Sequence, residues 1–232
     1  MNTTATATTD NALARLRLLQ LTSPALPVGA YAYSQGLEQA IETGWVSSAD
    51  ELQDWVGGLL QHGLCMLDIP VLLRLHAAWC ANDQTAVRHW SAWLHACRES
   101  AELQTEDRQL GSALARLLID LGLEEARVWQ GDTQATYATL FALAAARWQI
   151  AASDMALGYL WSWCENQIMA ALKLMPLGQT AGQRILSALI EQVPENIQRA
   201  ATCADTDIGQ LAPAQAIASA LHETQYSRLF RS

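Results

Sequence analysis

The chain has 232 residues, of which 51% are hydrophobic and only 16% are charged, an apolar composition for a globular protein. Its net charge is −9, and its 14 basic residues form no run that could neutralise phosphates, which argues against nucleic acid as a partner. The length favours one domain with one core over two, and the apolar excess predicts that some hydrophobic side chains are exposed at partner interfaces.

The first segments predict a frayed end followed by a short helix. Residues 1–9 are rich in Thr and Ala and contain no basic residue, so we expect a disordered N-terminal tail and no signal peptide or anchor. Asp10 is a plausible helix cap, and Leu13, Leu16 and Leu19 follow it at helical spacing. This helix should end near Ser23, because Pro24 disfavours helical geometry in the residue before it.

The next segments carry clear start and stop signals. A loop with Pro24, Pro27 and Gly29 leads to a helix expected to begin near Tyr33 and to end at Gly44. Residues 48–51, SADE, form a capping box that opens another helix. The buried stripe expected for that helix comprises Leu52, Trp55, Val56, Leu59 and Leu67.

The remainder of the chain also has helical periodicity. Asp68 and Pro70 mark a helix start, Asn82 and Asp83 mark a break, and Gly122 ends a long leucine-rich helix. Later apolar stripes follow Tyr137 and Leu160, and Pro176, Pro194 and Pro213 are expected to separate the last helices. Because no segment alternates with period two, the sequence predicts an all-α, single-domain helical bundle of about eight to ten helices over residues 10–221.

Composition also bears on compartment. The five cysteines are odd in number and scattered through apolar helical stretches, unlike a secreted disulfide framework, so a reducing cytoplasm fits best. The longest uncharged run, residues 133–146, is shorter than the roughly 20 residues that span a bilayer. We therefore expect a cytoplasmic protein that does not enter a membrane.

Standard catalytic motifs are absent from the sequence. The only lysine, Lys173, does not follow the glycines of a P-loop, and no nucleophile elbow, dinucleotide-binding turn or HExxH zinc motif occurs. Two pairs at helical spacing, His62 with Cys65 and His76 with Cys80, each supply only half a metal site. Such residues more often pack or cap a helix than bind metal, so we predict no catalytic, metal-binding or cofactor-binding residues.

Three further stretches contain features that core packing does not explain. The first is a rigid proline loop at residues 23–38, SPALPVGAYAYSQGLE. The second is residues 159–184, YLWSWCENQIMAALKLMPLGQTAGQR, in which Glu165, Asn166 and Lys173 interrupt an apolar helix. The third is residues 222–232, HETQYSRLFRS, which have more aromatic and apolar side chains than a disordered end normally has and so predict a partner-binding C-terminal tail.

Together these stretches resemble the UreF family of urease accessory proteins over nearly the whole chain. The resemblance implies an all-α, homodimeric, non-enzymatic scaffold without a cofactor. Such a scaffold would bind UreD, called UreH in some organisms, and the nickel-carrying GTPase UreG, and would couple GTP hydrolysis to nickel insertion into apo-urease. The residues carried over as partner-binding are Pro24, Pro27, Gly29, Tyr33, Ser34, Gln35, Gly36, Glu38, Glu165, Asn166, Lys173, Gln179, Gln183, His222, Glu223, Thr224, Gln225, Tyr226, Arg228, Leu229, Phe230 and Arg231.

Three structural hypotheses follow. The tail is expected to order when UreD binds and buries Tyr226, Leu229 and Phe230. The proline loop is expected to lie against the ordered tail, with Tyr33 donating a hydrogen bond. Lys173 is expected to face the GTPase partner.

Two other classes of function stay open on the sequence alone. One is a helical ligand-binding or hydrolase bundle with a pocket near Trp161, Trp163 and Glu165, since bundles bind ligands between their helices. The other is a generic oligomeric adaptor without a connection to metal.

Overall fold

The computed structural model describes residues 3–210 and 212–232, with side chains from Ala12 onward. Within these residues the predicted all-α class is confirmed, with ten α-helices and no strand. The helices are α1 (Thr3–Leu21), α2 (Leu37–Glu42), α3 (Ala49–Gly58), α4 (Asp68–Ala81), α5 (Gln84–Ala96), α6 (Ala101–Asp120), α7 (Tyr137–Arg147), α8 (Ala152–Leu174), α9 (Gln179–Ala201) and α10 (Pro213–His222).

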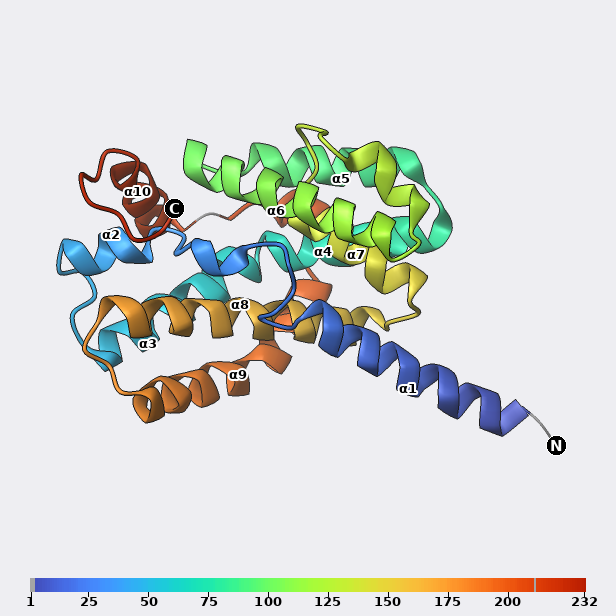
Figure 1. The fold of residues 1–232 in the computed structure, drawn as a ribbon, viewed down its shortest axis with the longest axis horizontal. Helices are drawn as coiled ribbons and strands as arrows, with labels where there is room; N and C mark the ends of the chain where they lie inside the picture. Colours follow the sequence, from blue (N-terminus) through green and yellow to red (C-terminus); the bar gives the residue numbers. More distant parts are fainter. Residues whose placement is uncertain (1–2, 211) are drawn as a thin grey trace.

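The helices form two packed groups joined by α4 and α8 (Figure 1). Helix α4 packs against α5 and α7, and α6 packs against α7, whereas α8 packs against α9, α2 and α1. Helix α10 lies on α2 and α6, and this brings the C-terminal end of the chain beside its N-terminal third (Figure 1). The core is continuous across both groups and includes the fully buried rings of Trp79, Trp129 and Phe141.

Several helix starts follow directly from side-chain caps. Ser48 accepts a hydrogen bond from the backbone N–H of Glu51, as the capping box predicts, and the Glu51 carboxylate accepts from the backbone N–H of Ser47. Asp83, Ser100 and Thr136 cap α5, α6 and α7 in the same way. Each cap satisfies a backbone donor that the helix itself cannot pair.

The structure differs from the predicted boundaries at three places. Helix α1 begins at Thr3, not after Asp10, and the Thr-rich segment before Asp10 contains no Gly or Pro that would stop a helix. Residues 1–2 of the expected tail lie outside the described residues. Helix α2 begins at Leu37, not Tyr33, because Gln35 and Gly36 adopt left-handed backbone angles with φ of 56° and 84°. Pro194 lies inside α9, where buried neighbours such as Val193 and Ile197 hold the helix together although the ring removes a backbone donor.

Over the described residues, no single helix has both the length and the apolarity to cross a membrane. The segments Ala49–Leu64 and Asp68–Ala81, which are bent relative to each other, reach that length and apolarity only when they are counted together. The first member of this pair is α3 continued by a π-helical segment, Leu59–Leu64.

Gly111 allows α6 to lie directly against the backbone that precedes α7. A Cβ atom at this position would be 2.4 Å from the carbonyl oxygen of Ala135, and backbone cannot give way as a flexible side chain would. We expect Gly111→Ala to lower the free energy of unfolding by about 1–3 kcal/mol, measured by urea denaturation. Gly58→Ala, in α3 with open space around it, is the control and should gain up to about 1 kcal/mol from its better helix propensity; an equal gain for Gly111→Ala would contradict the packing.

Candidate functional site

The three stretches singled out in the sequence meet at one place. The tail, residues 222–232, lies against the proline loop and reaches α6, while α8 lines the other side of the loop. In Figure 1 the C-terminus lies beside α2 and α10. The expectation that the proline loop lies against the tail is confirmed, and every one of these contacts is made within a single chain.

Glu38, at the start of α2, anchors the middle of the tail. One carboxylate oxygen accepts from the backbone N–H of Leu229 at 2.7 Å, and the other accepts from that of Phe230 at 2.8 Å. The Glu38 residue is only 6% exposed. Hydrogen bonds to a carboxylate are stronger than neutral ones, and burial protects them from competing water.

Ser232 is held by the turn that precedes α2. Its carbonyl oxygen accepts from the backbone N–H groups of Ser34 at 2.6 Å and Gln35 at 3.1 Å, and from the Ser34 hydroxyl at 2.6 Å. These successive backbone donors converge on one acceptor, and the left-handed φ angles of Gln35 and Gly36 then turn the chain into α2. Gly36 is also in close contact with α10, because a Cβ there would lie 3.0 Å from the backbone nitrogen of Ser219.

Glu106 of α6 connects the tail to α8 through the loop. Its carboxylate accepts from the Ser232 hydroxyl at 2.8 Å and from the Gln35 side-chain amide at 2.7 Å. Gln35 in turn accepts from the indole N–H of Trp163 at 2.7 Å. Burial raises the pKa of Glu106 to about 7, although both hydrogen bonds favour its charged form.

Tyr33 links the loop to both neighbouring helices. Its hydroxyl donates to the side-chain oxygen of Gln109 on α6, which confirms the predicted donor role, and its carbonyl oxygen accepts from Asn166 of α8 at 3.2 Å. Burial raises the pKa of the Tyr33 hydroxyl, while Arg231 acts in the opposite direction. On the outer side, the Lys173 ammonium lies 5.3 Å from the centre of the Phe230 ring, a cation–π contact with the tail.

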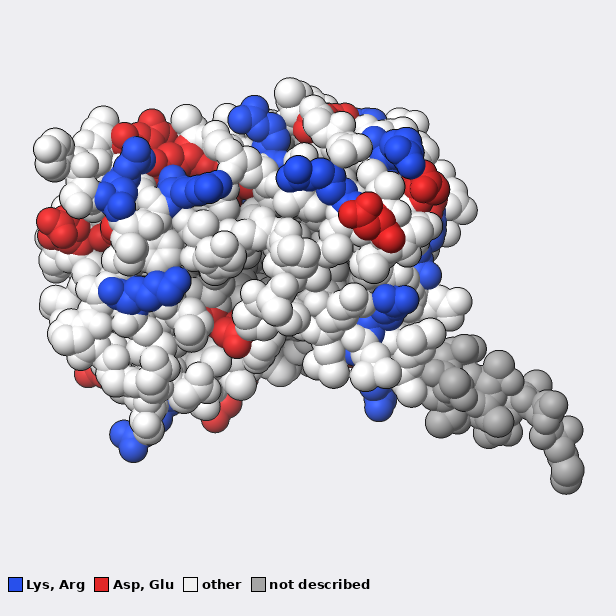
Figure 2. All heavy atoms as spheres, in the orientation of Figure 1, with Lys and Arg blue, Asp and Glu red and all other residues white. Residues whose placement is uncertain are grey.

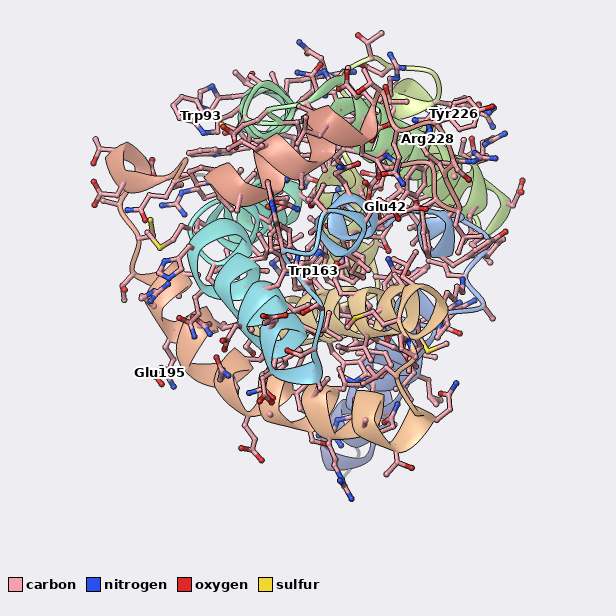
Figure 3. The ribbon with its side chains drawn as sticks, turned by 90° about the vertical axis from the view of Figure 1, so that its left-hand side faces the viewer. Glu42, Trp93, Trp163, Glu195, Tyr226 and Arg228 are labelled. Carbon is pink, nitrogen blue, oxygen red and sulfur yellow. The ribbon has the colours of Figure 1, made fainter. Side chains whose placement is uncertain are left out.

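The tail has an inner and an outer side. His222, Phe230 and Ser232 are buried, whereas Tyr226 is fully exposed and Leu229 is 63% exposed. Figure 3 shows Tyr226 and Arg228 at the edge of the molecule. The structure therefore differs from the expectation that Phe230 waits for a partner, because Phe230 is already buried against its own chain.

The remaining residues named from the sequence fall into three groups. Ser34, Gly36 and Glu38 are buried beneath the tail, while Pro24, Glu165, Asn166 and Lys173 line an adjoining cavity of about 250 Å³. Pro27, Gln179 and Gln183 are exposed and share none of the contacts described above, and Gly29 takes the left-handed angles that start a short 3-10 helix. In the tail, the exposed Glu223 accepts from the backbone N–H of Ala101, and Thr224 and Arg231 are also exposed, whereas Gln225 is half-buried.

The sequence analysis did not find the acidic residues of α6 that receive the tail. Glu102 and Glu106 are one helical turn apart, and Gln109 follows on the same face. The helical spacing of these polar residues, beside the buried Leu110, was the signal that the sequence offered for this binding face. It has the same pattern as an ordinary solvated helix face, so it could not indicate a binding role on its own.

A second buried charged group lines the same cavity. Arg98 donates to both oxygens of Asp68, at 2.6 and 3.1 Å, and to Asp107 at 3.0 Å. Asp107 also accepts from the backbone N–H of Tyr137 at the start of α7. This cluster joins α4, α6 and α7, and the link before α6, through one guanidinium.

The paired histidines and cysteines form no multidentate centre in the described part of the chain. His76 lies 3.9 Å from the Cys80 sulfur, but its other ring nitrogen faces the carbonyl of Ile150. Cys65 is buried, which raises its pKa to about 12, whereas His62 is exposed. Among the residues that the structure describes, no group of three or more His, Cys, Asp or Glu side chains could hold a metal ion.

This geometry defines an all-α protein whose C-terminal segment is bound by its own N-terminal loop. The sequence model of the UreF family matches residues 46–190. The chain is 56% identical over 224 residues to the urease accessory protein UreF of Alkalilimnicola ehrlichii, covering 97% of this chain and 98% of that one. It is 50% identical over 220 residues to UreF of Hahella chejuensis (95% and 99% covered) and 46% identical over 236 residues to UreF of Pseudoalteromonas translucida (100% of both).

The chain belongs to the UreF family of urease accessory proteins, as the resemblance found in the sequence implied.

Proposed function

We propose that this protein is a non-enzymatic scaffold required for nickel insertion into apo-urease, which bridges UreD (UreH) and the GTPase UreG and couples GTP hydrolysis to assembly of the metal centre. Support comes from the naming of its relatives as urease accessory proteins and from the tail, which presents its outer side to solvent. The solvent exposure of the outer side of the tail is the observation on which the proposal depends most. A segment fixed from within but exposed outside offers a preorganised binding surface, so little ordering entropy is lost on binding.

The partner-binding surface we propose for UreD consists of Tyr226 and Leu229, with Arg228 and Arg231 beside them. Ile217 and Leu221 of α10 are also exposed and extend the apolar area. Figure 2 shows basic and acidic side chains close together over the region that α10 and the tail occupy. An exposed aromatic residue with an arginine nearby is typical of residues that dominate binding energy.

The test separates binding from folding. Because Tyr226 and Leu229 lie outside the inner contacts, Tyr226→Ala with Leu229→Ala should weaken UreD binding roughly thirtyfold, the loss of about 2 kcal/mol expected for an aromatic anchor. Binding is measured by titration of purified UreD, followed by co-purification with UreG and nickel activation of apo-urease in vitro. Val128→Ala, which is equally exposed but lies between α6 and α7, is the control. Unchanged UreD affinity in the double variant would exclude this surface.

The proposal extends to the recruitment of UreG and to assembly. We place UreG near Lys173 and the cavity lined by Pro24, Glu165 and Asn166, and we propose that the chain acts in the cytoplasm as a homodimer. Lys173→Ala should reduce UreG recruitment by more than it reduces UreD affinity, since Lys173 also contacts Phe230 of the tail. Sedimentation should give twice the mass of one chain. Equal recruitment by the Lys173→Ala variant would place UreG elsewhere.

One observation favours a second candidate function, a ligand-binding bundle. The 250 Å³ cavity is lined by Trp163 and Glu165, two of the three residues expected around such a pocket, and burial raises the pKa of Glu165. Native mass spectrometry of the purified chain distinguishes the two readings. A small molecule retained in stoichiometric amount would support the ligand-binding function, whereas the bare chain mass would favour the scaffold.

A further inference from the structure

His222 lies between two carboxylates from different helices. Its Nδ1 is 2.8 Å from Glu102 of α6, its Nε2 is 3.1 Å from Glu38 of α2, and the side chain is completely buried. A neutral imidazole has one N–H donor and one acceptor nitrogen, and an acceptor nitrogen facing a carboxylate oxygen is repulsive. With Glu38 and Glu102 both ionised, both contacts are hydrogen bonds only when the ring carries two protons.

The balance of charge around His222 agrees with a protonated ring. Glu38 and Glu102 supply two negative charges, and Arg228 of the tail donates to the second oxygen of Glu102 at 2.8 Å. With imidazolium and guanidinium together the cluster is neutral, whereas a neutral ring leaves one excess negative charge in a buried place, which is costly. Other titratable groups on the same elements include Glu223, which accepts from the backbone of Ala101, and Glu106, which accepts from Ser232.

Glu38 is also the residue that holds the tail. The carboxylate oxygen that faces His222 accepts from the backbone N–H of Phe230, and its companion accepts from that of Leu229. The position of Glu38 therefore determines the position of two consecutive tail residues. A change in its attraction to His222 is transmitted to the tail directly.

We propose that His222 is a positioning residue for the tail: its doubly protonated ring holds Glu38 and Glu102 together, and loss of one of these protons as the pH rises loosens the tail. The direction follows from the geometry, since the tail is held at the lower pH and loosened at the higher pH. Only the consequence for UreD binding rests on the proposed function.

The first experiment observes the ring and the tail in the full chain. Nitrogen-15 NMR of labelled histidine should give two protonated ring nitrogens for His222 while the tail is protected, and loss of one proton at the pH where that protection falls. Hydrogen-exchange protection of the Leu229 and Phe230 amides should fall roughly tenfold over the same pH interval, because their acceptor loses its position. A ring with one proton while the tail is protected, or protection that is independent of pH, would overturn the inference.

Three variants make the assignment specific. His222→Gln can donate to only one carboxylate and does not titrate, so it should give lower tail protection without a pH step. His89→Gln, at an exposed histidine of α5, is the matched control and should keep the step. Glu106→Gln removes the other group that titrates near the tail, and disappearance of the step in this variant would assign the effect to Glu106 and reject the role of His222.

A last measurement relates the contacts of His222 with Glu38 and Glu102, called here the clamp, to UreD binding. UreD affinity of the unmodified chain should fall as the pH rises, in step with amide protection, whereas the affinity of His222→Gln should change much less over that interval. If the NMR and exchange results hold but UreD binding is absent at every pH, the clamp stands and the proposed function fails. If UreD binds strongly with no relation to tail protection, the clamp has no role in recognition.

Discussion

Replacing Arg98 by alanine is expected to lower the free energy of unfolding by about 3–5 kcal/mol, measured by urea denaturation with tryptophan fluorescence. The guanidinium is 18% exposed and binds two carboxylates, Asp68 and Asp107, that are 8% and 6% exposed. Alanine would leave both negative charges buried without a compensating cation. The expected loss of unfolding free energy is therefore the cost of burying two carboxylates without a counter-charge, and it is not the net contribution of the ion pairs.

Two further variants test that reason. Arg127→Ala breaks an ion pair with Glu124 in which both side chains are more than half exposed, so it should cost no more than about 1 kcal/mol. A triple variant, Asp68→Asn with Arg98→Met and Asp107→Asn, removes all three charges and should recover most of the loss, because neutral replacements of a buried ion cluster are often tolerated. If Arg98→Ala costs no more than Arg127→Ala, the cluster does not hold α4, α6 and α7 together.

Replacing Glu106 by glutamine is expected to stabilise the protein at alkaline pH and to flatten its pH dependence. Burial raises the pKa of Glu106 from 4.5 to about 7 in the folded chain, so the native state resists ionisation of this group. Stability contributed by the neutral acid is complete below about pH 4.5 and is lost as the pH rises through about 7. The unfolding free energy of Glu106→Gln relative to the unmodified chain should rise by about 3 kcal/mol over that interval.

The geometry allows glutamine at this position. Its carbonyl oxygen can accept from Gln35, and its amide can donate to the Ser232 hydroxyl oxygen, so each of the two partners keeps one hydrogen bond with this side chain. Glu191→Gln, on an exposed face of α9, is the matched control and should not change the pH dependence. A pH profile for Glu106→Gln that is parallel to that of the unmodified chain would show that Glu106 is ionised in the native state at little cost.

The helices were predictable from the sequence because leucine spacing and caps act locally. Ser48 with Glu51, Asp68 and Gly122 each gave a boundary that the structure has within a residue or two. The errors arose where tertiary contacts override local preference. Gln35 adopts a left-handed angle without being glycine, and Pro194 sits in a helix that its buried neighbours hold together.

The site was predictable in part. The proline loop, the polar interruptions of α8 and the aromatic tail each stood out by composition, and Glu38 was among the residues named. The convergence of the three could not be derived, because it depends on how α2, α6 and α10 pack in space. Glu102 and Glu106 went unnoticed for the same reason, since only the packed structure distinguishes an acidic residue that receives a chain end from one that faces water.

The pairing of Ser34 with Ser232 spans 198 positions of the chain. During synthesis from the N-terminus, the turn before α2 is complete long before the segment that satisfies its backbone donors has been made. Those donors and the Glu38 carboxylate must remain hydrated, or engage another molecule, throughout that period. The surface proposed to meet UreD is consequently among the last parts of the molecule to form, so a nascent chain cannot present it before residues 222–232 have left the ribosome.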